Sequence, residues 1–355
     1  MIVADLFAGV GGLSQGFIKA GCEVAFAVEF DKEIADAYKK NHPNTEVFAE
    51  DICQLDIDKV KQKYPLIDIV MGGPPCQGFS QKGKRLNLGD PRNFLFKQFV
   101  RFVAAFKPKY FVLENVPNII TTSNGYFKDQ IIHEFSELGY DVCCGVLCAS
   151  DFGVPQDRKR AVFMGQFGKL EIGLPISNGR KTTIKDAIYD LPFIGSGEGE
   201  EKSKYDKAPL SEFQKELRGN ATILYNHIAT KHSKAAIEKL KLIPKGKGKE
   251  VLPEYLLTKS IYSGTWSRLL EDGIAPTITT RFDTPSSGRF THPVLNRCLT
   301  VREAARIQTF PDSFIFYGSK GSQMKQVGNA VPPMLAYAIA NVIVNNEKYK
   351  WFCGI

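Results

Sequence analysis

The feature that most constrains this chain is a pattern repeated through its first half: a continuously apolar run, a turn and an amphipathic helical segment. The predicted strands are Ile2–Phe7, Val24–Glu29, Glu46–Asp51, Ile67–Gly73, Tyr110–Asn115, Asp141–Leu147 and Arg160–Phe167. The predicted helices include Leu13–Ala20, Lys32–Lys40, Asn93–Phe106 and Phe127–Leu138. Apolar strands that alternate with helices indicate a parallel, doubly wound α/β sheet with helices on both faces. Ligands of such sheets bind at the carboxyl ends of the strands, so the residues after each strand are the candidates for function.

The regular pattern fades after Gly168. Residues 168–296 contain Gly-rich and Lys-rich stretches, an excess of basic residues and few strand patterns. Regular patterns return at Leu299–Gln308 and in an apolar helix, Pro333–Val344. We therefore predict a second, smaller and irregular domain inserted before the C-terminal helix.

Composition narrows the class of protein. The net charge of +8 and the pI near 8.9 favour a polyanionic partner. None of the eight cysteines forms a CxxC pair, so no metal site is predicted, and the thiols are expected to be reduced. No run approaches the roughly 20 apolar residues that span a bilayer, and the N-terminus lacks the basic region of a signal peptide. We expect a cytoplasmic protein with no membrane partner.

The first three predicted strands end in a pattern suited to a nucleoside-containing cofactor. The first strand leads into the run DLFAGVGG at residues 5–12, where glycines allow the backbone to approach a ligand at a helix N-terminus. The second strand ends at Glu29, about 20 residues further on, where a carboxylate can accept both ribose hydroxyls. The third ends at Asp51-Ile52, where it can meet an adenine amine. The spacing leaves open a dinucleotide, S-adenosylmethionine, or glycines that serve strand–helix packing alone.

The fourth predicted strand ends in GGPPCQGFS, residues 72–80. The two prolines impose a stiff, extended approach and present Cys76 at the carboxyl edge of the sheet. The fifth strand delivers Glu114-Asn115-Val116 to the same edge. A carboxyl group beside a thiol in a cleft suits acid-assisted nucleophilic addition.

Together these motifs resemble the ordered set of the C5-cytosine DNA methyltransferases of bacterial restriction-modification systems. The resemblance rests on DLFAGVGG, GGPPCQGFS, ENV, QDRKR at residues 156–160, RCLTVREAARIQTFPDSF at 297–314 and QVGNAVPP at 326–333. It covers residues 1–167 and 297–340. It implies a Rossmann-like class I methyltransferase sheet with a smaller target-recognition domain, the catalytic domain being 1–175 with 313–355 and the recognition domain 176–312.

The resemblance implies a mechanism. Cys76 would add to C6 of a cytosine flipped out of double-stranded DNA, and C5 would then take the methyl group. Glu114 would contact N3, which requires a raised pKa, and Arg160 would bind O2 with Arg158 nearby. The cofactor would be S-adenosyl-L-methionine, with S-adenosyl-L-homocysteine as the product.

The resemblance also assigns cofactor residues. Phe7 and Phe30 would face the adenine, although Phe30 could instead pack in the core, while Glu29 would bind the ribose and Asp51 the adenine amine. The backbone around Gly9 and Gly11, with Asn329, would hold the methionine end. The other residues expected at this site are Asp5, Ala8, Gly12, Ile52, Pro74 and Ala330.

DNA contacts are expected in two places. The Gly-punctuated, basic loop after Cys76 can close over DNA and meet phosphates. Its candidate residues are Gln77, Ser80, Lys82, Lys84 and Arg85. The run Pro276-Thr277-Ile278-Thr279 resembles the core of the family's target-recognition region, so Thr277, Thr279, Arg281 and Arg289 are candidate DNA contacts. The resemblance leaves open a separately encoded restriction endonuclease as functional partner or an orphan enzyme without one.

Four alternatives were weighed. A methyltransferase of exocyclic amines would carry an Asp/Asn-Pro-Pro-aromatic loop, which differs from GGPPCQ. A tRNA C5-cytosine methyltransferase shares the PPCQ and ENV motifs but carries a Cys-Phe-Thr tripeptide that this sequence lacks. A catalytically silent DNA-binding regulator would be expected to have lost Cys76 or Glu114. The motifs downstream of the glycines disfavour an NAD-dependent dehydrogenase.

Overall fold

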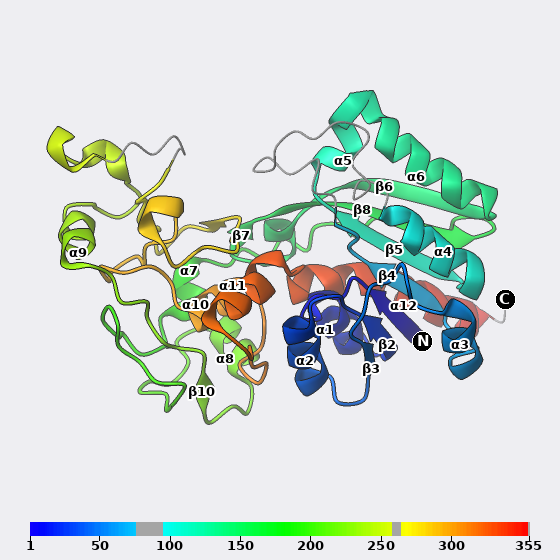
Figure 1. Cartoon of the computed structure of the whole chain (residues 1–355), viewed down its shortest axis with the longest axis horizontal. Coiled ribbons are helices and arrows are strands. Elements are labelled where there is room, and N and C mark those ends of the chain that lie inside the picture. The colour runs from blue at the N-terminus through cyan, green and yellow to red at the C-terminus, as the bar shows by residue number, and fades with distance from the viewer. Residues whose placement is uncertain (76–94, 258–263, 354–355) are drawn as a thin grey trace. The chain divides into compact units, whose positions relative to one another are not determined.

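The computed structural model describes residues 1–75, 95–257 and 264–353. The chain divides into two compact units. Unit 1 comprises 1–148, 159–178 and 333–355, and unit 2 comprises 149–158 and 179–332. Figure 1 shows the sheet and its helices in unit 1 and the mostly irregular chain of unit 2.

Unit 1 is built on a seven-stranded sheet whose strand order is β3-β2-β1-β4-β5-β8-β6. The strands are β1 (Ile2–Leu6), β2 (Glu23–Val28), β3 (Glu46–Phe48), β4 (Ile69–Gly72), β5 (Tyr110–Asn115), β6 (Tyr140–Cys148) and β8 (Lys159–Phe167). All seven predicted strands are confirmed, with ends that match or differ by at most three residues. The order reverses beside β1, which places the ends of β1, β2 and β4 at the position where doubly wound sheets bind ligands.

The prediction of a parallel sheet is wrong for one strand. β8 lies between β5 and β6 and is antiparallel to both, while the remaining neighbours pair in parallel. Only residues 149–158 separate β6 from β8, and they contain no crossover helix of the kind that a parallel connection requires. Apolar strand patterns do not record direction, which explains the difference.

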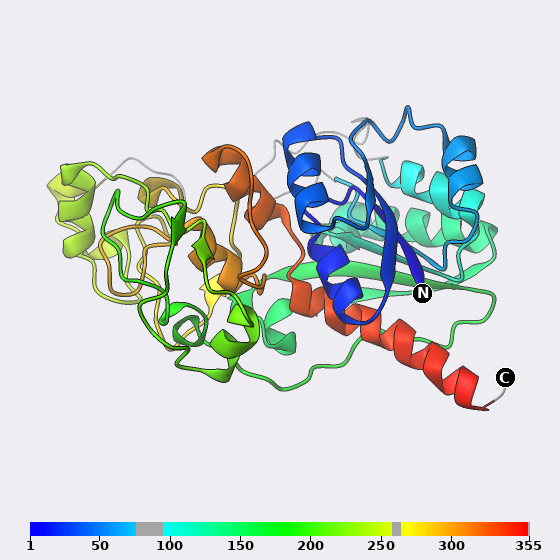
Figure 2. The same cartoon turned by 90° about the horizontal axis from the view of Figure 1, so that it is seen from below.

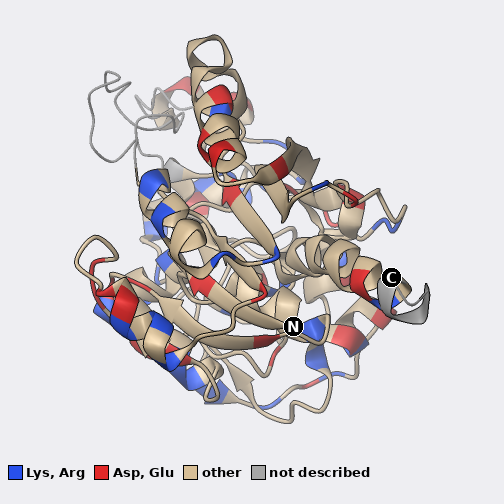
Figure 3. Ribbon diagram, turned by 90° about the vertical axis from the view of Figure 1, so that its right-hand side faces the viewer, with Lys and Arg blue, Asp and Glu red and all other residues tan. Residues whose placement is uncertain are grey.

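Helices cover both faces of the sheet, as predicted. They are α1 (Gly12–Lys19), α2 (Lys32–Asn41), α3 (Ile57–Lys63), α4 (Phe96–Phe106), α5 (Asn118–Thr121), α6 (Tyr126–Glu137) and α12 (Pro333–Cys353). On one face, buried residues of α3, α4 and α6 pack with alternate strand residues, among them Phe111 and Phe163. Lys, Arg, Asp and Glu are interspersed along the outer helices (Figure 3).

Helix α12 is longer than predicted and lies along α1 (Figure 2). A stretch within residues 320–349 is long and apolar enough to cross a membrane by length and composition alone, but 56% of it is buried. Leu335, Ile339 and Ile343 have no exposed surface. Burial in unit 1 therefore accounts for the apolar character of this helix.

Unit 2 has little regular structure. Its helices are α7 (Ile184–Ile188), α8 (Glu212–Arg218), α9 (Lys234–Lys241), α10 (Val301–Ile307) and α11 (Lys320–Asn329). Its strands form two short pairs, β9 (Lys202–Ser203) with β10 (Leu224–Tyr225) and β7 (Gln156–Asp157) with β11 (Ala275–Pro276). The predicted irregularity after Gly168 agrees with this architecture.

The boundaries of the compact units differ from the predicted domain boundaries. Residues 149–158 and 313–332 pack within unit 2, whereas the sequence placed them in the catalytic domain. The Asn226 side chain, for example, donates to the Phe316 carbonyl at 2.8 Å and accepts from the Phe316 N–H at 2.9 Å. Such contacts between distant segments leave no local signature in the sequence.

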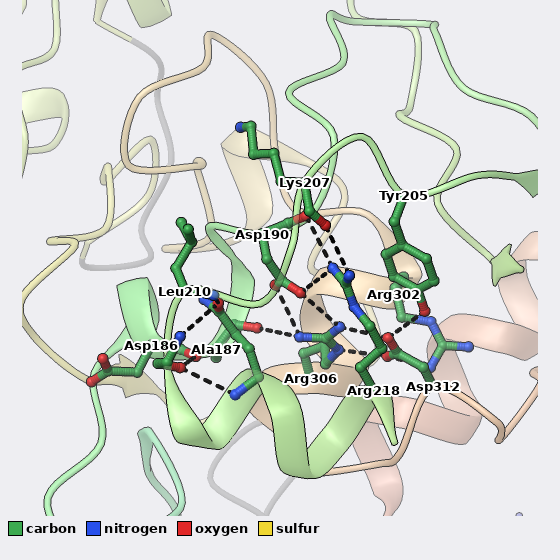
Figure 4. Close-up of polar contacts among 12 residues, drawn as sticks. Asp186, Ala187, Asp190, Tyr205, Lys207, Leu210, Arg218, Arg302, Arg306 and Asp312 are labelled. Atoms are coloured by element: carbon green, nitrogen blue, oxygen red, sulfur yellow. Dashed lines mark hydrogen bonds and ion pairs between the residues drawn. The ribbon is translucent and has the colours of Figure 1, made fainter. Parts of the chain in front are cut away.

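A buried ionic cluster holds α10 within unit 2 (Figure 4). The Arg306 guanidinium donates to both carboxylate oxygens of Asp312 at 2.5 Å and to Asp190 Oδ1 at 3.1 Å. Arg218 donates to Asp190 Oδ2 at 2.5 Å. Burial disfavours the charge on Asp312, but the adjacent Arg306 outweighs it and holds the pKa of that carboxyl below its usual value.

Candidate active site

The loop after β1 is pinned to the end of β2. The Glu29 carboxylate accepts from the N–H of Gly9 and from the N–H of Asp31, both at 2.8 Å. The Ala8 N–H donates to the Val28 carbonyl at 3.0 Å, and Gly12 begins α1. Burial raises the pKa of Glu29. The sequence predicted Glu29 as a ribose ligand, and the structure adds that Glu29 shapes the glycine loop beside it.

A buried polar network lies beneath this loop. Asp5 is fully buried, and its Oδ2 accepts from the Ser14 hydroxyl at 2.6 Å. Ser14 is also hydrogen-bonded to the Tyr38 hydroxyl at 2.7 Å. Asp5 Oδ1 has no hydrogen-bond partner among the residues that the structure describes. Burial raises the pKa of Asp5 to about 7, so the charge on this carboxyl changes near neutral pH.

The aromatic and acidic residues predicted to face an adenine lie on the same edge of unit 1. The Phe30 side chain is 73% exposed, so the alternative that it packs in the core is wrong. Phe7 is half-buried against the core cluster. Asp51 is half-buried and its Oδ1 accepts from the Cys53 N–H at 2.9 Å, while Ile52 is buried. An exposed ring beside carboxylates fits a nucleoside with a positively charged tail.

A side chain at the end of β5 is hydrogen-bonded to the segment that follows β4. The Asn115 amide donates to the Pro74 carbonyl at 2.8 Å and accepts from the Val116 N–H at 2.8 Å. A Cβ atom at Gly73 would lie 2.8 Å from Glu114 Oε2, so the backbone just after β4 passes close to the carboxylate. The structure thus places Glu114 against the segment that leads into Cys76.

Glu114 and Arg160 form an ion pair. Arg160 Nε lies 2.6 Å from Glu114 Oε1, and the two side chains are 13% and 10% exposed. The pairing of β5 with β8 brings these residues together although they are 46 positions apart. The Arg160 Nη1 also donates to the Lys159 carbonyl at 2.7 Å. A carboxyl group and a guanidinium side by side can contact two neighbouring polar atoms of one planar base.

Arg158 is placed differently from Arg160. It is fully buried in unit 2, where its guanidinium donates to the carbonyls of Ile278 at 3.0 Å and Gly328 at 2.9 Å. These contacts hold two backbone segments of unit 2. The two arginines that the sequence grouped as catalytic therefore have different environments in the structure.

The predicted recognition residues of unit 2 are mixed in exposure. The Thr277 hydroxyl donates to the Asp157 carbonyl at 2.7 Å, and the Thr279 hydroxyl oxygen is buried. The side chains of Arg281 and Arg289 are exposed. The arginines are therefore the better candidates for contact with a partner, because the threonine hydroxyls face the protein.

The cofactor residues predicted near the C-terminus also lie in unit 2. Asn329 ends α11 and is exposed, and Ala330 follows it with its carbonyl 3.4 Å from the Gln308 amide nitrogen. Six predicted residues lie outside the described part of the chain: Cys76, Gln77, Ser80, Lys82, Lys84 and Arg85. Within the described part, no group of three or more His, Cys, Asp or Glu residues could hold a metal ion.

Three residues of this region were not among the predicted site residues. Asn115 ties the end of β5 to Pro74, and Gln156 and Gln308 are joined by a buried hydrogen bond of 2.8 Å. Asn115 stands in the ENV motif and Gln156 in the QDRKR motif, so their position in the sequence was a usable signal. Gln308 also stands in a quoted motif, but its partner is 152 residues away.

Comparison with known proteins decides the family. The family model for C-5 cytosine-specific DNA methylase matches residues 1–345. The chain belongs to this family. It is 40% identical to the Type II methyltransferase M.DdeI of Desulfomicrobium norvegicum over 99% of this chain and 89% of that protein. It is 39% identical to the Type II methyltransferase M1.HphI of Haemophilus parahaemolyticus over 96% and 86% of the two chains. The chain is accordingly a DNA (cytosine-5-)-methyltransferase.

Solved structures agree with the fold. A DNA modification methyltransferase encoded within a prophage (E. coli) has a TM-score of 0.82 and 30% identity, covering 98% of this chain and 99% of that one. The DNMT2 of Spodoptera frugiperda has a TM-score of 0.64 and 16% identity, covering 96% and 99%. The Rossmann-like methyltransferase fold predicted from the sequence is confirmed.

Proposed function

We propose that this methyltransferase moves the methyl group of S-adenosyl-L-methionine to C5 of a cytosine flipped out of a specific double-stranded DNA sequence. The observation that carries the proposal is the Glu114–Arg160 ion pair, which stands beside the Gly73-Pro74 segment leading to Cys76. Family membership supports the same chemistry.

The residues of unit 1 fit the cofactor. Phe30 offers an exposed ring, Glu29 and Asp51 offer carboxylates to hydroxyl and amine donors, and Asp5 adds a buried acid beneath the loop. Asn329 and Ala330 are proposed to contact the methionine end. When bound, the cofactor supplies a methyl group on a positively charged sulfur. The protein's task is to make cytosine C5 nucleophilic.

The nucleophile is proposed to be Cys76. Its thiolate adds to C6, and the electron pair of the C5–C6 bond becomes available at C5, which takes the methyl group. Glu114 in its protonated form donates a hydrogen bond or its proton to N3 and Arg160 donates to O2, so both stabilise the negative charge that the addition places on the ring. A base then removes the C5 proton, the C5–C6 double bond forms again, and the thiolate leaves. The Cys76 thiolate, and with it the enzyme, is regenerated unchanged.

Trapping on modified DNA tests the chemistry. Duplexes containing 5-fluorocytosine should form a covalent adduct with the wild-type protein, because fluorine does not leave as the proton does. Cys76→Ser should abolish both the adduct and methyl transfer while leaving cofactor binding nearly intact. Mapping the adduct by mass spectrometry decides the assignment, and attachment to a different cysteine contradicts it.

Sequence recognition is proposed to reside in residues 176–296. This stretch is irregular, has an excess of basic residues and carries the exposed Arg281 and Arg289. The test exchanges it for the equivalent stretch of a relative that methylates a different site. Bisulfite sequencing of host DNA then reads the specificity. An active chimera that keeps the original site would place recognition elsewhere.

The biological setting is proposed to be restriction-modification. The curated relatives named Type II methyltransferases support it, and a separately encoded endonuclease would be the partner. DNA from cells expressing the protein should resist cleavage by an endonuclease of the same specificity. The DNMT2 structures share the fold at 16% identity, which is no argument for an RNA substrate. Methylation of tRNA without methylation of DNA would overturn the proposal.

A further inference from the structure

Three segments of unit 2 that are far apart in the sequence meet around β7. They are residues 155–158, which lead into β8, residues 275–279, which include β11, and residues 327–330 at the end of α11. β7 and β11 pair in parallel, and the Ala275 N–H donates to the Pro155 carbonyl at 2.9 Å. Two of these segments carry proposed substrate contacts. Residues 275–279 lead toward Arg281, a proposed DNA contact, and residues 327–330 include Asn329 and Ala330, which are proposed to contact the cofactor.

A chain of buried amides joins the three segments. The Ile278 N–H donates to Gln156 Oε1 at 2.7 Å, and Gln156 Nε2 donates to Gln308 Oε1 at 2.8 Å. Gln308 Nε2 in turn donates to the Val327 carbonyl at 2.6 Å. Both glutamine side chains have no exposed surface. Each amide group therefore uses its oxygen and its nitrogen at once, and solvent cannot replace either contact.

Backbone packing and Arg158 reinforce the same arrangement. Arg158 donates to the carbonyls of Ile278 and Gly328. A Cβ atom at Gly328 would lie 2.5 Å from the carbonyl carbon of Thr279, so the two segments are in direct backbone contact. The glutamine hydrogen bonds add to the pairing of β11 with β7 and hold Ile278 against the end of α11.

We propose that Gln308 is a positioning residue, which couples the DNA-reading segment to the cofactor segment through Gln156 and Val327. The proposal rests on the proposed function of those two segments. Gln308 touches neither DNA nor cofactor, because its amide is occupied by protein partners on both sides. Its loss leaves Gln156 Nε2 and the Val327 carbonyl without their partner, and both segments must shift to compensate.

The test compares Gln308→Met with a matched control, Gln214→Met. Gln214 is an equally buried glutamine of unit 2, on α8, whose amide donates to the Lys185 carbonyl at 3.0 Å. Calorimetry with S-adenosyl-L-homocysteine and fluorescence anisotropy with a cognate duplex give the two dissociation constants. Steady-state kinetics give kcat and both KM values.

For Gln308→Met we expect both dissociation constants and both KM values to rise about tenfold, which is about 1.4 kcal/mol of binding free energy for each ligand. Hydrogen exchange at the Ile278 amide should quicken. Gln214→Met should lose stability alone. If Gln308→Met changes only stability, as the control does, the coupling is wrong.

A second variant guards against a folding failure. Gln156→Met breaks the chain from its other end, at the bonds to Ile278 and Gln308, and places no charge in a site that has no exposed surface. It should reproduce the rise in both dissociation constants, and unchanged constants would overturn the proposal. A wild-type protein that binds S-adenosyl-L-homocysteine but never methylates DNA would instead contradict the proposed function, and the cofactor constant would still test the coupling.

Discussion

The two units satisfy the hydrogen-bonding groups of their buried backbone in different ways. In unit 1, strands of one sheet satisfy one another's N–H and C=O groups, and the core between sheet and helices is apolar. In unit 2, strands are two residues long, and side chains supply the missing donors. Among the described residues, the buried arginines all belong to unit 2: Arg158, Arg268, Arg297, Arg302 and Arg306.

Arg268 shows how such a residue works. Its guanidinium donates to the carbonyls of Leu240, Ile243, His292 and Leu295 and to the Asn296 side chain. A guanidinium offers five donors in one plane, so a single buried side chain can replace a length of β-ladder. The comparison teaches that a domain with little regular secondary structure stays folded when buried arginine side chains bind the backbone carbonyls that strands and helices would otherwise satisfy.

The largest effect is expected at the edge of unit 1, where chemistry is proposed. Glu114→Gln keeps the size of the side chain but supplies neither proton nor charge at N3. We expect the methylation rate to fall by about 10²–10⁴, with little change in DNA affinity. Single-turnover kinetics measure the chemical step. Unchanged single-turnover and steady-state rates would show that Glu114 serves the ion pair with Arg160 structurally.

The next-largest effect is expected from removing one of the buried arginines that distinguish unit 2. Arg306→Met leaves the buried carboxylate of Asp312 without its main partner and removes one of the two arginines that contact Asp190, which should cost about 3–5 kcal/mol of unfolding free energy. Urea denaturation measures the loss. The control is Lys241→Met, which breaks the exposed pair with Glu238 and should cost less than about 1 kcal/mol. Equal losses would mean that burial of the pair is unimportant.

A third prediction uses the buried acid of unit 1. The pKa of Asp5 rises from 3.8 to about 7 on burial, so between these values the folded state holds a proton that the unfolded state has released. Stability contributed by Asp5 is therefore present at low pH and lost as pH rises toward 7. Asp5→Asn should flatten this decline, most visibly between about pH 4 and pH 7, by up to a few kcal/mol.

Denaturant unfolding at several pH values provides the measurement. Asp36→Asn changes an exposed carboxyl on α2 and serves as the control, with a pH profile expected to follow the wild type. A profile of Asp5→Asn that also follows the wild type would mean that Asp5 titrates alike in both states.

The smallest effect concerns recognition in unit 2. Arg281→Ala removes an exposed guanidinium that we expect to contact a base edge, relaxing site discrimination by about 1–3 kcal/mol. Competition between cognate and altered duplexes measures it. A contact to phosphate alone would weaken binding to every sequence and lower the salt dependence, which would contradict base readout at this position.

The sequence by itself determined the strands of unit 1, the glycine loop after β1 and the motifs that identify the family. These signals are local: apolar strand runs, a glycine turn and short motifs are legible without knowing what lies next to them. The exposure of Phe30 and the Glu29 contact with Gly9 agree with that interpretation.

Only the tertiary structure decided the direction of β8, the ion pair of Glu114 with Arg160 and the burial of Arg158 against the carbonyls of Ile278 and Gly328. It also decided that Gln308 meets Gln156 across 152 residues. The physical reason is that burial of a charge or an amide is unfavourable unless a hydrogen-bond or ion-pair partner lies next to it. In these cases the partner comes from a distant segment of the chain. A sequence shows the polar side chain, and the fold alone supplies its partner.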